Sequence, residues 1–252
     1  MAKIIAFTNQ KGGVGKTTSC VNLTAALSSL GKRVLLVDCD PQGNASSGMG
    51  VAKTTRPNTY DMLINGVQPE ECIVRTAYGD LIPTGKELAA ASVELIRAEK
   101  REFILKNALQ KLYSDYDYIF IDCPPSLELL TVNALVAADS VLIPMQCEYY
   151  ALEGIVDLMT SIRLCSKKLN RRLQIEGIIL TMYDARANLT TQVANELRRH
   201  LGDKVYHTVI PRTVRLSEAP SHGIPGVFYD RSNKGSKAYM ALAEEFLAQQ
   251  KE

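Results

Sequence analysis

The stretch NQKGGVGKTTS, residues 9–19, decides the fold of this sequence. The strand-like segment KIIAFTN, residues 3–9, leads into it, and residues 17–30 are expected to form a helix. A strand, a glycine-rich loop and a helix in this order form the setting in which a phosphate-binding loop is credible. The stretch therefore predicts an α/β fold with a phosphate site at the end of its first strand.

The alternation of strand-like and helix-like segments continues along the chain. We expect further strands at residues 33–38, 116–125, 140–146, 173–182 and 204–211, and further helices at 127–138, 152–168, 193–201 and 236–249. The strand segments are nearly continuous Val, Ile and Leu, which is typical of parallel strands buried on both faces. The sequence therefore predicts a doubly wound, mostly parallel sheet flanked by helices. Residues 53–112 are less regular and indicate several short helices, with one more strand left open.

Length and composition favour a single globular domain over residues 1–252. The chain is 46% hydrophobic and 22% charged and contains no linker-like segment. No run of about 18 apolar residues is present, and the N-terminus reads as a strand, without a secretion signal. The six cysteines are scattered without a CxxC pair, which favours a reducing cytoplasm over a disulfide framework or a structural zinc site.

Within the opening stretch, each residue type has a chemical reason. Gly15, Lys16 and Thr17 fit the end of the pattern GxxxxGK[ST], although Gln10 stands where its first glycine is expected. Backbone N–H groups of such a loop bind phosphates, the lysine neutralises them, and the threonine hydroxyl binds Mg²⁺. Lys11 has no place in this pattern. From the residues alone it is equally a solvated loop lysine or a second phosphate ligand.

Three aspartates follow predicted strands, at the edge where open α/β sheets bind ligands. Asp122 ends the apolar run IFID, the layout of a Walker B strand, so we expect it to hold Mg²⁺ through water. Asp38 and Asp40 end the second strand. Asp38 is equally interpreted as a structural residue that caps the following turn.

Taken together, the motifs resemble the ParA/MinD superfamily of ATPases. KGGVGKTT is similar to its deviant Walker A box, and DCDPQGNASSGMG, IFIDCPPS, PMQCEYYALEG and PRTVRLSEAPSHG are similar to segments of its short ParA/Soj members, which partition chromosomes. The resemblance extends along most of the chain. It implies a P-loop ATPase with a deviant Walker A motif that uses ATP and Mg²⁺ in chromosome or plasmid segregation.

The resemblance also implies roles for individual residues. The nucleotide would be bound by Gly12, Gly13, Val14, Gly15, Lys16, Thr17, Thr18, Met182, Pro211 and Arg212. Thr17 and Asp122 would hold Mg²⁺, and Asp40 would position or activate the attacking water. Lys11 would reach across a homodimer to the nucleotide of the other protomer. Lys11, Lys16 and Asp40 are therefore the expected catalytic residues.

Basic residues are concentrated in residues 160–237, which hold fourteen Lys and Arg against six Asp and Glu. The run RLCSKKLNRR, residues 163–172, is interpreted as a solvated helix face. For Arg186 and Arg215 the resemblance implies binding of double-stranded DNA without sequence preference, through phosphate contacts. Lys234 and Lys237, in a further basic cluster, are expected to bind DNA as well.

Partners and location also follow from the resemblance. It implies an ATP-dependent homodimer and a centromere-binding partner of the ParB type that stimulates hydrolysis. We expect a cytoplasmic, nucleoid-associated protein without an additional N-terminal operator-binding domain.

Two other functions remain open on the same fold. A MinD-like positioning ATPase would bind membrane through a C-terminal amphipathic helix. The tail KAYMALAEEFLAQQKE carries Glu244 and Glu245, which anionic lipid repels, so we expect no membrane partner. An iron–sulfur enzyme would need cysteines placed to bridge two subunits, a pattern that the scattered cysteines do not form.

Overall fold

The computed structural model describes residues 1–149 and 151–250. These residues form a seven-stranded sheet in the order β3-β4-β2-β5-β1-β6-β7, in which β3 pairs antiparallel with β4 and the other pairs are parallel. The strands are β1 (Lys3–Phe7), β2 (Val34–Asp38), β3 (Val74–Thr76), β4 (Gly79–Ile82), β5 (Tyr118–Asp122), β6 (Ser140–Gln146) and β7 (Gln174–Thr181). The predicted doubly wound, mostly parallel sheet is therefore confirmed.

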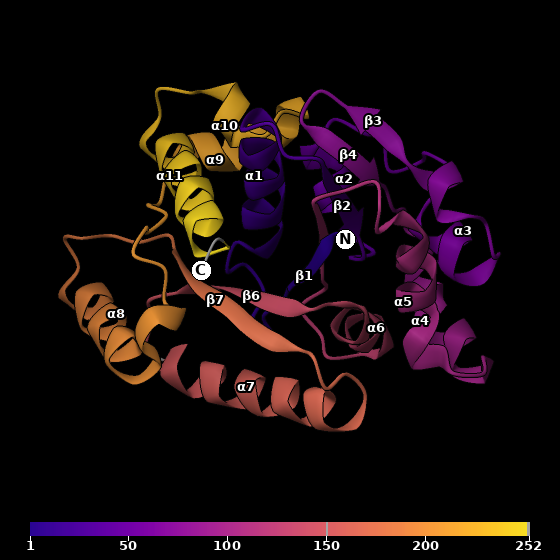
Figure 1. The fold of residues 1–252 in the computed structure, drawn as a ribbon. Helices are drawn as coiled ribbons and strands as arrows, with labels where there is room; N and C mark the ends of the chain where they lie inside the picture. Colours follow the sequence, from indigo (N-terminus) through magenta and orange to yellow (C-terminus); the bar gives the residue numbers. More distant parts are fainter. Residues whose placement is uncertain (150, 251–252) are drawn as a thin grey trace.

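Helices cover both faces of this sheet (Figure 1). One face carries α1 (Lys16–Ser29), α10 (Gly226–Tyr229) and α11 (Lys234–Gln249). The other face carries α4 (Leu88–Glu94), α5 (Ile104–Leu109), α6 (Leu129–Ala137), α7 (Ala151–Lys168) and α8 (Asn188–Leu201). The short helices α2 (Asn44–Gly48), α3 (Thr59–Ile64) and α9 (Val214–Glu218) lie in connecting segments.

Successive residues of the central strand pack on opposite faces of the sheet. Ile4 and Ala6 of β1 belong to the core beneath α6 and α7, whereas Ile5 and Phe7 belong to the core beneath α1 and α11. All four side chains are fully buried. A strand buried on both sides needs apolar residues at every position, which explains the uninterrupted apolar runs in the sequence.

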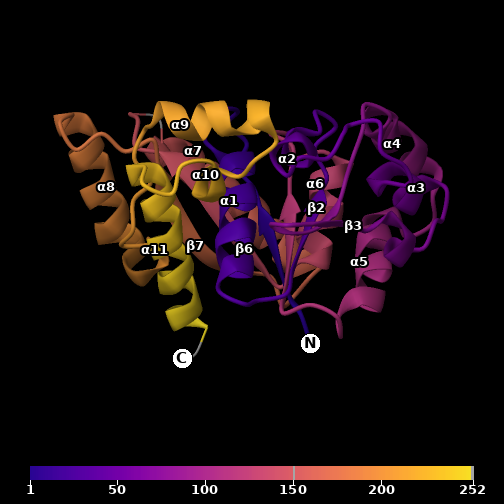
Figure 2. The same cartoon turned by 90° about the horizontal axis from the view of Figure 1, so that it is seen from above.

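The loops that follow the parallel strands meet at one edge of the sheet. Phe7 at the end of β1 and Asp38 at the end of β2 are both register partners of Asp122 at the end of β5. In Figure 2 the two marked chain ends lie at the bottom, while α2 and α9 lie at the opposite, upper side. This carboxyl edge is where open α/β sheets bind ligands.

One predicted strand, at residues 204–211, is wrong. The segment forms only isolated bridges, such as Ile178 with Val205, and runs beside β7 without a ladder. The backbone N–H groups of His207 and Thr208 donate instead to the carboxylate of Glu245 on α11, at 2.7 and 2.9 Å. A side chain from a distant helix thus takes the donors that a strand would use.

Other boundaries differ by smaller amounts. The irregular segment 53–112 contains two strands, β3 and β4, where one further strand was left open. Helix α8 begins at Asn188, five residues before the predicted start. The last helix packs on the sheet through one side, because Tyr239, Leu242 and Phe246 of α11 are buried. Among the described residues, no helix combines the length and apolar character needed to cross a membrane.

Candidate nucleotide-binding site

The loop between β1 and α1 has a backbone that requires glycine. Gly13 and Gly15 have φ values of 73° and 86°, in the left-handed region that other residues rarely adopt. Gly15 caps α1 and has no side chain to accept hydrogen bonds from the first N–H groups of the helix. Those N–H groups, together with the positive end of the helix dipole, form an anion site.

Most of the predicted phosphate ligands line one cleft of about 340 Å³. Its walls are formed by Gly12, Gly13, Gly15, Lys16, Thr17, Thr18, Asp40, Gln42, Asn44, Pro125 and Met182. Val14 is buried behind the loop, where its carbonyl accepts a hydrogen bond of 2.7 Å from the Thr181 hydroxyl. Lys11 is not a wall residue of this cleft and instead forms an ion pair with Glu148.

Lys16 is nearly buried, with 6% of its surface exposed. Its Nζ donates a hydrogen bond of 3.1 Å to the carbonyl of Lys11, across the loop. Burial lowers the pKa of Lys16, and the negative charges of Asp122 and Asp40 oppose this shift. An ammonium group in such a poorly hydrated position gains most from a phosphate that replaces the carbonyl.

The carboxylate of Asp122 is the most unusual group of the site. Both of its oxygens are buried, and neither accepts a hydrogen bond from any residue in the described ranges. Burial, reinforced by the charge of Asp38, raises the pKa of Asp122 well above its ordinary value, while the nearby Thr17 hydroxyl and Lys16 ammonium favour the charged form. Buried carboxylates normally have hydrogen-bond partners, so these two oxygens are suited to bind a cation.

The cation site is not complete in protein groups alone. Among residues 1–149 and 151–250, no group of three or more His, Cys, Asp or Glu side chains could hold a metal ion. Mg²⁺ is usually held by one or two carboxylates together with substrate phosphates and water. Asp122 and Thr17 therefore fit a Mg²⁺ ion that arrives with a phosphorylated ligand.

The two aspartates at the end of β2 have different roles. Asp38 is fully buried and accepts hydrogen bonds from the backbone N–H and the hydroxyl of Ser46, at 2.8 and 2.7 Å. Burial raises the pKa of Asp38 to about 6, and these hydrogen bonds limit the shift. Asp38 is thus the residue that fixes α2 beneath the loop. Asp40 lines the cleft and is 7% exposed, and its Oδ1 accepts a hydrogen bond of 3.0 Å from the Gln42 N–H.

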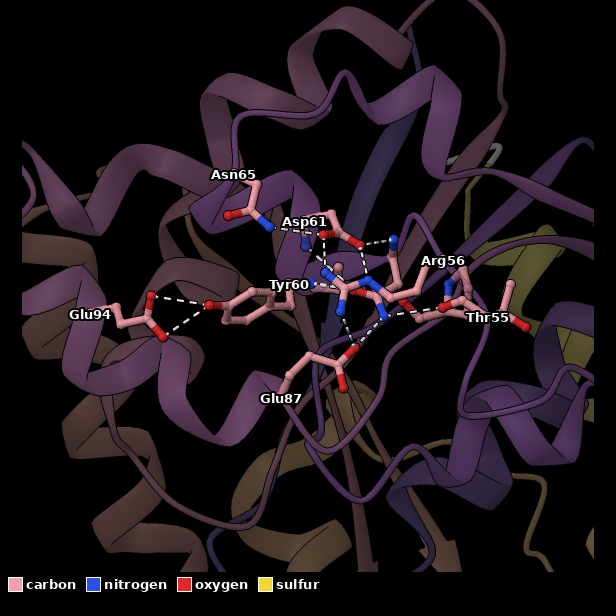
Figure 3. Close-up of polar contacts among 10 residues, drawn as sticks. Thr55, Arg56, Tyr60, Asp61, Asn65, Glu87 and Glu94 are labelled. Atoms are coloured by element: carbon pink, nitrogen blue, oxygen red, sulfur yellow. Dashed lines mark hydrogen bonds and ion pairs between the residues drawn. The ribbon is translucent and has the colours of Figure 1, made fainter.

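The loop after Asp40 is held from outside by Lys53, whose Nζ donates to the carbonyl of Gln42 and to Oδ1 of Asn44. A cluster of polar contacts follows a few residues further on (Figure 3). There Arg56 binds Asp61 and lies 3.7 Å from Glu87. The segment that follows the cleft is therefore anchored before the chain enters α3.

The three predicted nucleotide-binding residues outside the loop lie in an adjoining cavity of about 180 Å³. Met182, Pro211 and Arg212 line it, and Gly15, Thr18 and Met182 are shared with the phosphate cleft. The backbone N–H of Tyr183 donates a hydrogen bond of 2.9 Å to the carbonyl of Ile210, which joins the segment after β7 to the segment before Pro211. Thr181, which was not predicted from the sequence, lies in this cavity and also donates a hydrogen bond to the loop. Thr181 ends β7, and its place at the carboxyl end of a parallel strand is the sequence signal that could have indicated it.

The four predicted DNA-binding residues lie near the ends of α8, α9 and α11. Arg186 is 91% exposed and forms an ion pair of 2.9 Å with Asp184. Its hydrogen bonds lower the pKa of Asp184 to about 2, and the charge of Lys234 adds to the effect. Arg215 pairs with Glu218 at 3.0 Å. Lys237 lies one turn further along α11 and borders a separate cavity.

Comparison with known proteins agrees with this geometry. The family model described as an AAA domain matches residues 2–175. The chain is 55% identical to the sporulation initiation inhibitor protein Soj of Bacillus subtilis, over 98% of this chain and 99% of that protein. It is 48% identical to the chromosome partitioning protein ParA of Caulobacter vibrioides, over 99% of this chain and 96% of that protein.

A solved structure is similar over the whole chain. It is named cobyrinic acid a,c-diamide synthase from Mycobacterium smegmatis, with bound ADP and magnesium, and it is 36% identical with a TM-score of 0.87. The alignment covers 100% of this chain and 96% of that chain. Because these relatives are 48–55% identical over nearly their whole length, this chain belongs to the Soj/ParA family of chromosome-partitioning ATPases.

Proposed function

We propose that this chain, as a single domain, is an ATP- and Mg²⁺-dependent switch that dimerises on ATP, binds DNA and releases it after hydrolysis. The observation that carries the proposal is the buried Asp122 carboxylate without a hydrogen-bond partner in the described chain, beside the buried Lys16 of a glycine-rich loop. The loop amides from Gly12 to Thr18 and Lys16 bind the phosphates. Thr17 and Asp122 hold Mg²⁺, which supplies charge neutralisation on the phosphate oxygens when it is bound.

Asp40 is the residue proposed to orient the attacking water. It borders the same cleft as Lys16 and Thr17, and the Gln42 N–H fixes one of its oxygens. A carboxylate in this position accepts a hydrogen bond from water and turns a lone pair of the water oxygen toward the cleft. The tethers from Lys53 to the following loop keep this carboxylate in place.

Lys11 is proposed to act across a homodimer. Its side chain is 54% exposed and does not line the cleft of its own chain. A triphosphate brings about four negative charges, and Lys16 with Mg²⁺ leaves part of them uncompensated. A cation supplied by a second protomer makes dimerisation depend on the nucleotide. In other phosphate-loop enzymes an arginine finger supplied in trans likewise neutralises phosphate charge, and there it accelerates hydrolysis.

Nucleotide-dependent dimerisation would in turn control DNA binding. One protomer offers the few exposed basic groups Arg186, Arg215, Lys234 and Lys237, and a dimer offers twice as many. The logarithm of the affinity falls with the logarithm of the salt concentration in proportion to the number of phosphates neutralised. Doubling the contacts therefore changes DNA affinity steeply. We propose further that a centromere-binding protein of the ParB type stimulates hydrolysis on the nucleoid, in the cytoplasm.

The membrane-binding alternative has less support. The apolar side of α11 packs on the sheet through Leu242 and Phe246, so it is not available for a bilayer. Glu245 of the same helix is committed to the backbone of residues 207 and 208. We therefore propose DNA, and not membrane, as the large anionic partner.

Binding of random-sequence DNA tests this function directly. We expect binding with ATP and Mg²⁺ to exceed binding with ADP, and Arg186→Ala to make the slope of log affinity against log salt shallower by about 1.8, because each dimer loses two contacts. Fluorescence anisotropy with labelled DNA measures both quantities. Arg163→Ala, on the exposed face of α7, is the matched control and should keep the parent slope. DNA affinity that is indifferent to the nucleotide would contradict the proposed switch.

A further inference from the structure

The lysine that the proposed dimer needs is already bound within a single chain. Lys11 Nζ forms an ion pair with Oε2 of Glu148, which lies in the turn between β6 and α7. The two side chains are 54% and 50% exposed. Neither the motifs nor the proposed nucleotide site assigns a role to Glu148.

The backbones on both sides of this ion pair are tied together by other contacts. Gln146 Nε2 donates 3.0 Å to the carbonyl of Gly13, and Asn9 Nδ2 donates 2.9 Å to the carbonyl of Pro144. The N–H of Lys11 donates 3.0 Å to Oδ1 of the same Asn9. The phosphate loop and the end of β6 are therefore fixed relative to each other, and the ion pair forms between two prearranged segments.

The second lysine of the loop is bound in the same way. Lys16 Nζ donates to the carbonyl of Lys11, while Lys11 Nζ binds Glu148. Both ammonium groups are thus held by groups of their own chain, in series. A phosphate that binds Lys16 Nζ displaces it from the carbonyl of Lys11, and Lys11 is the residue whose side chain pairs with Glu148.

We propose that Glu148 is a positioning residue that holds Lys11 in the single protomer and competes for it with the triphosphate of a partner protomer. This inference rests on the proposed function, in which Lys11 acts across the dimer. Two Lys11–Glu148 pairs must then break for each dimer that forms. A half-exposed ion pair is a weak competitor, which a triphosphate can displace. The carboxylate of Glu148 therefore weakens dimerisation of the ATP-bound protein.

Removing the charge of Glu148 tests its effect on dimerisation. In an Asp40→Ala background with ATP and Mg²⁺, Glu148→Gln is expected to tighten dimerisation by about 2- to 30-fold. The reason is that two exposed Lys11–Glu148 ion pairs, one in each protomer, no longer have to break when the dimer forms. Glu148→Asp keeps the charge and should stay close to the parent. Sedimentation equilibrium measures the dimer constants, and ATP affinity of the Lys11→Ala protomer should not change with Glu148→Gln. Glu153→Gln, exposed on the first turn of α7, is the matched control.

Carbodiimide cross-linking tests the contact itself. The reagent joins a carboxylate and an amine that touch, and it takes up the water released as the amide forms. Peptide mass spectrometry of the nucleotide-free protein should detect a Lys11–Glu148 amide, which Glu148→Gln abolishes. The cross-link should decrease when ATP and Mg²⁺ are added to Asp40→Ala. The Lys3–Glu176 pair, 2.8 Å apart at the start of β1, is the internal control that should not change.

The outcomes separate this inference from the proposed function. A Glu148→Gln dimer as weak as the parent or weaker would overturn the competition, and so would a nucleotide-free chain without the Lys11–Glu148 cross-link. If the Asp40→Ala protein forms the cross-link without nucleotide but stays monomeric with ATP and Mg²⁺, the result would contradict the dimer itself. It would then also exclude any competition for Lys11.

Discussion

Asp40→Ala is expected to lower ATP turnover by about 10²–10⁴-fold, the usual contribution of a positioned acid–base group. The side chain of Asp40 borders the cleft beside Lys16, and its removal takes away the carboxylate proposed to orient water. The phosphate loop and Asp122 remain intact, so ATP should still bind. The expected variant is therefore a nucleotide-binding protein with almost no turnover.

Phosphate release at saturating ATP measures the loss, and a fluorescent ATP analogue measures binding. Asp157→Ala serves as the control, because Asp157 is an exposed carboxylate of α7 and does not line the cleft. This variant should turn over ATP as the parent does. Unchanged turnover in Asp40→Ala would mean that another group orients the water. Loss of binding together with turnover would mean that Asp40 supports the loop structurally.

Asp122→Asn is expected to weaken ATP binding about 10- to 100-fold when Mg²⁺ is present, the range for residues that hold a metal through water. The substitution keeps the size of the side chain but removes the charge of a buried carboxylate that no described residue satisfies. Without Mg²⁺, the variant and the parent should bind ATP with similar affinity. The difference between the two conditions isolates the metal contact from any general damage to the fold.

Isothermal titration calorimetry with Mg²⁺ and with EDTA gives the four affinities, and thermal unfolding of the nucleotide-free proteins checks that both are folded. If Mg²⁺ strengthens ATP binding equally in the two proteins, Asp122 does not take part in holding the cation.

The phosphate loop and Asp122 were predictable from sequence because both depend on local pattern and strand direction. The glycines of the loop stand where the backbone has positive φ, at Gly13 and Gly15. Asp122 ends an apolar run, and parallel strands bring such ends to one edge of the sheet. Neither inference needed knowledge of a distant contact.

The role of Asp38 was not predictable in the same way. Its partner Ser46 lies eight residues further on and in turn accepts a hydrogen bond from the N–H of Thr84. The failed strand at residues 204–211 has a similar cause, since Glu245 on α11 binds its N–H groups. Contacts between segments so far apart leave no periodic signal in either segment.

Charge counts were also an incomplete guide. Residues 160–237 hold an excess of basic residues, but Arg186 and Arg215 each pair with a neighbouring carboxylate, Asp184 and Glu218. The Lys11–Glu148 pair joins residues 137 positions apart, so the sequence could not show that Lys11 is held within its own chain. Side-chain partners decide how much of a formal charge is available to a ligand.

Nucleotide-dependent dimerisation through Lys11 is the claim on which DNA binding and the role of Glu148 both depend. Sedimentation velocity of Asp40→Ala measures it most directly, with Mg²⁺ and either ATP or ADP, alongside the Lys11→Ala derivative. The account predicts a dimer for Asp40→Ala with ATP, and monomers with ADP and for the derivative under both conditions. Monomers throughout, or an ATP-bound dimer that survives Lys11→Ala, would contradict it.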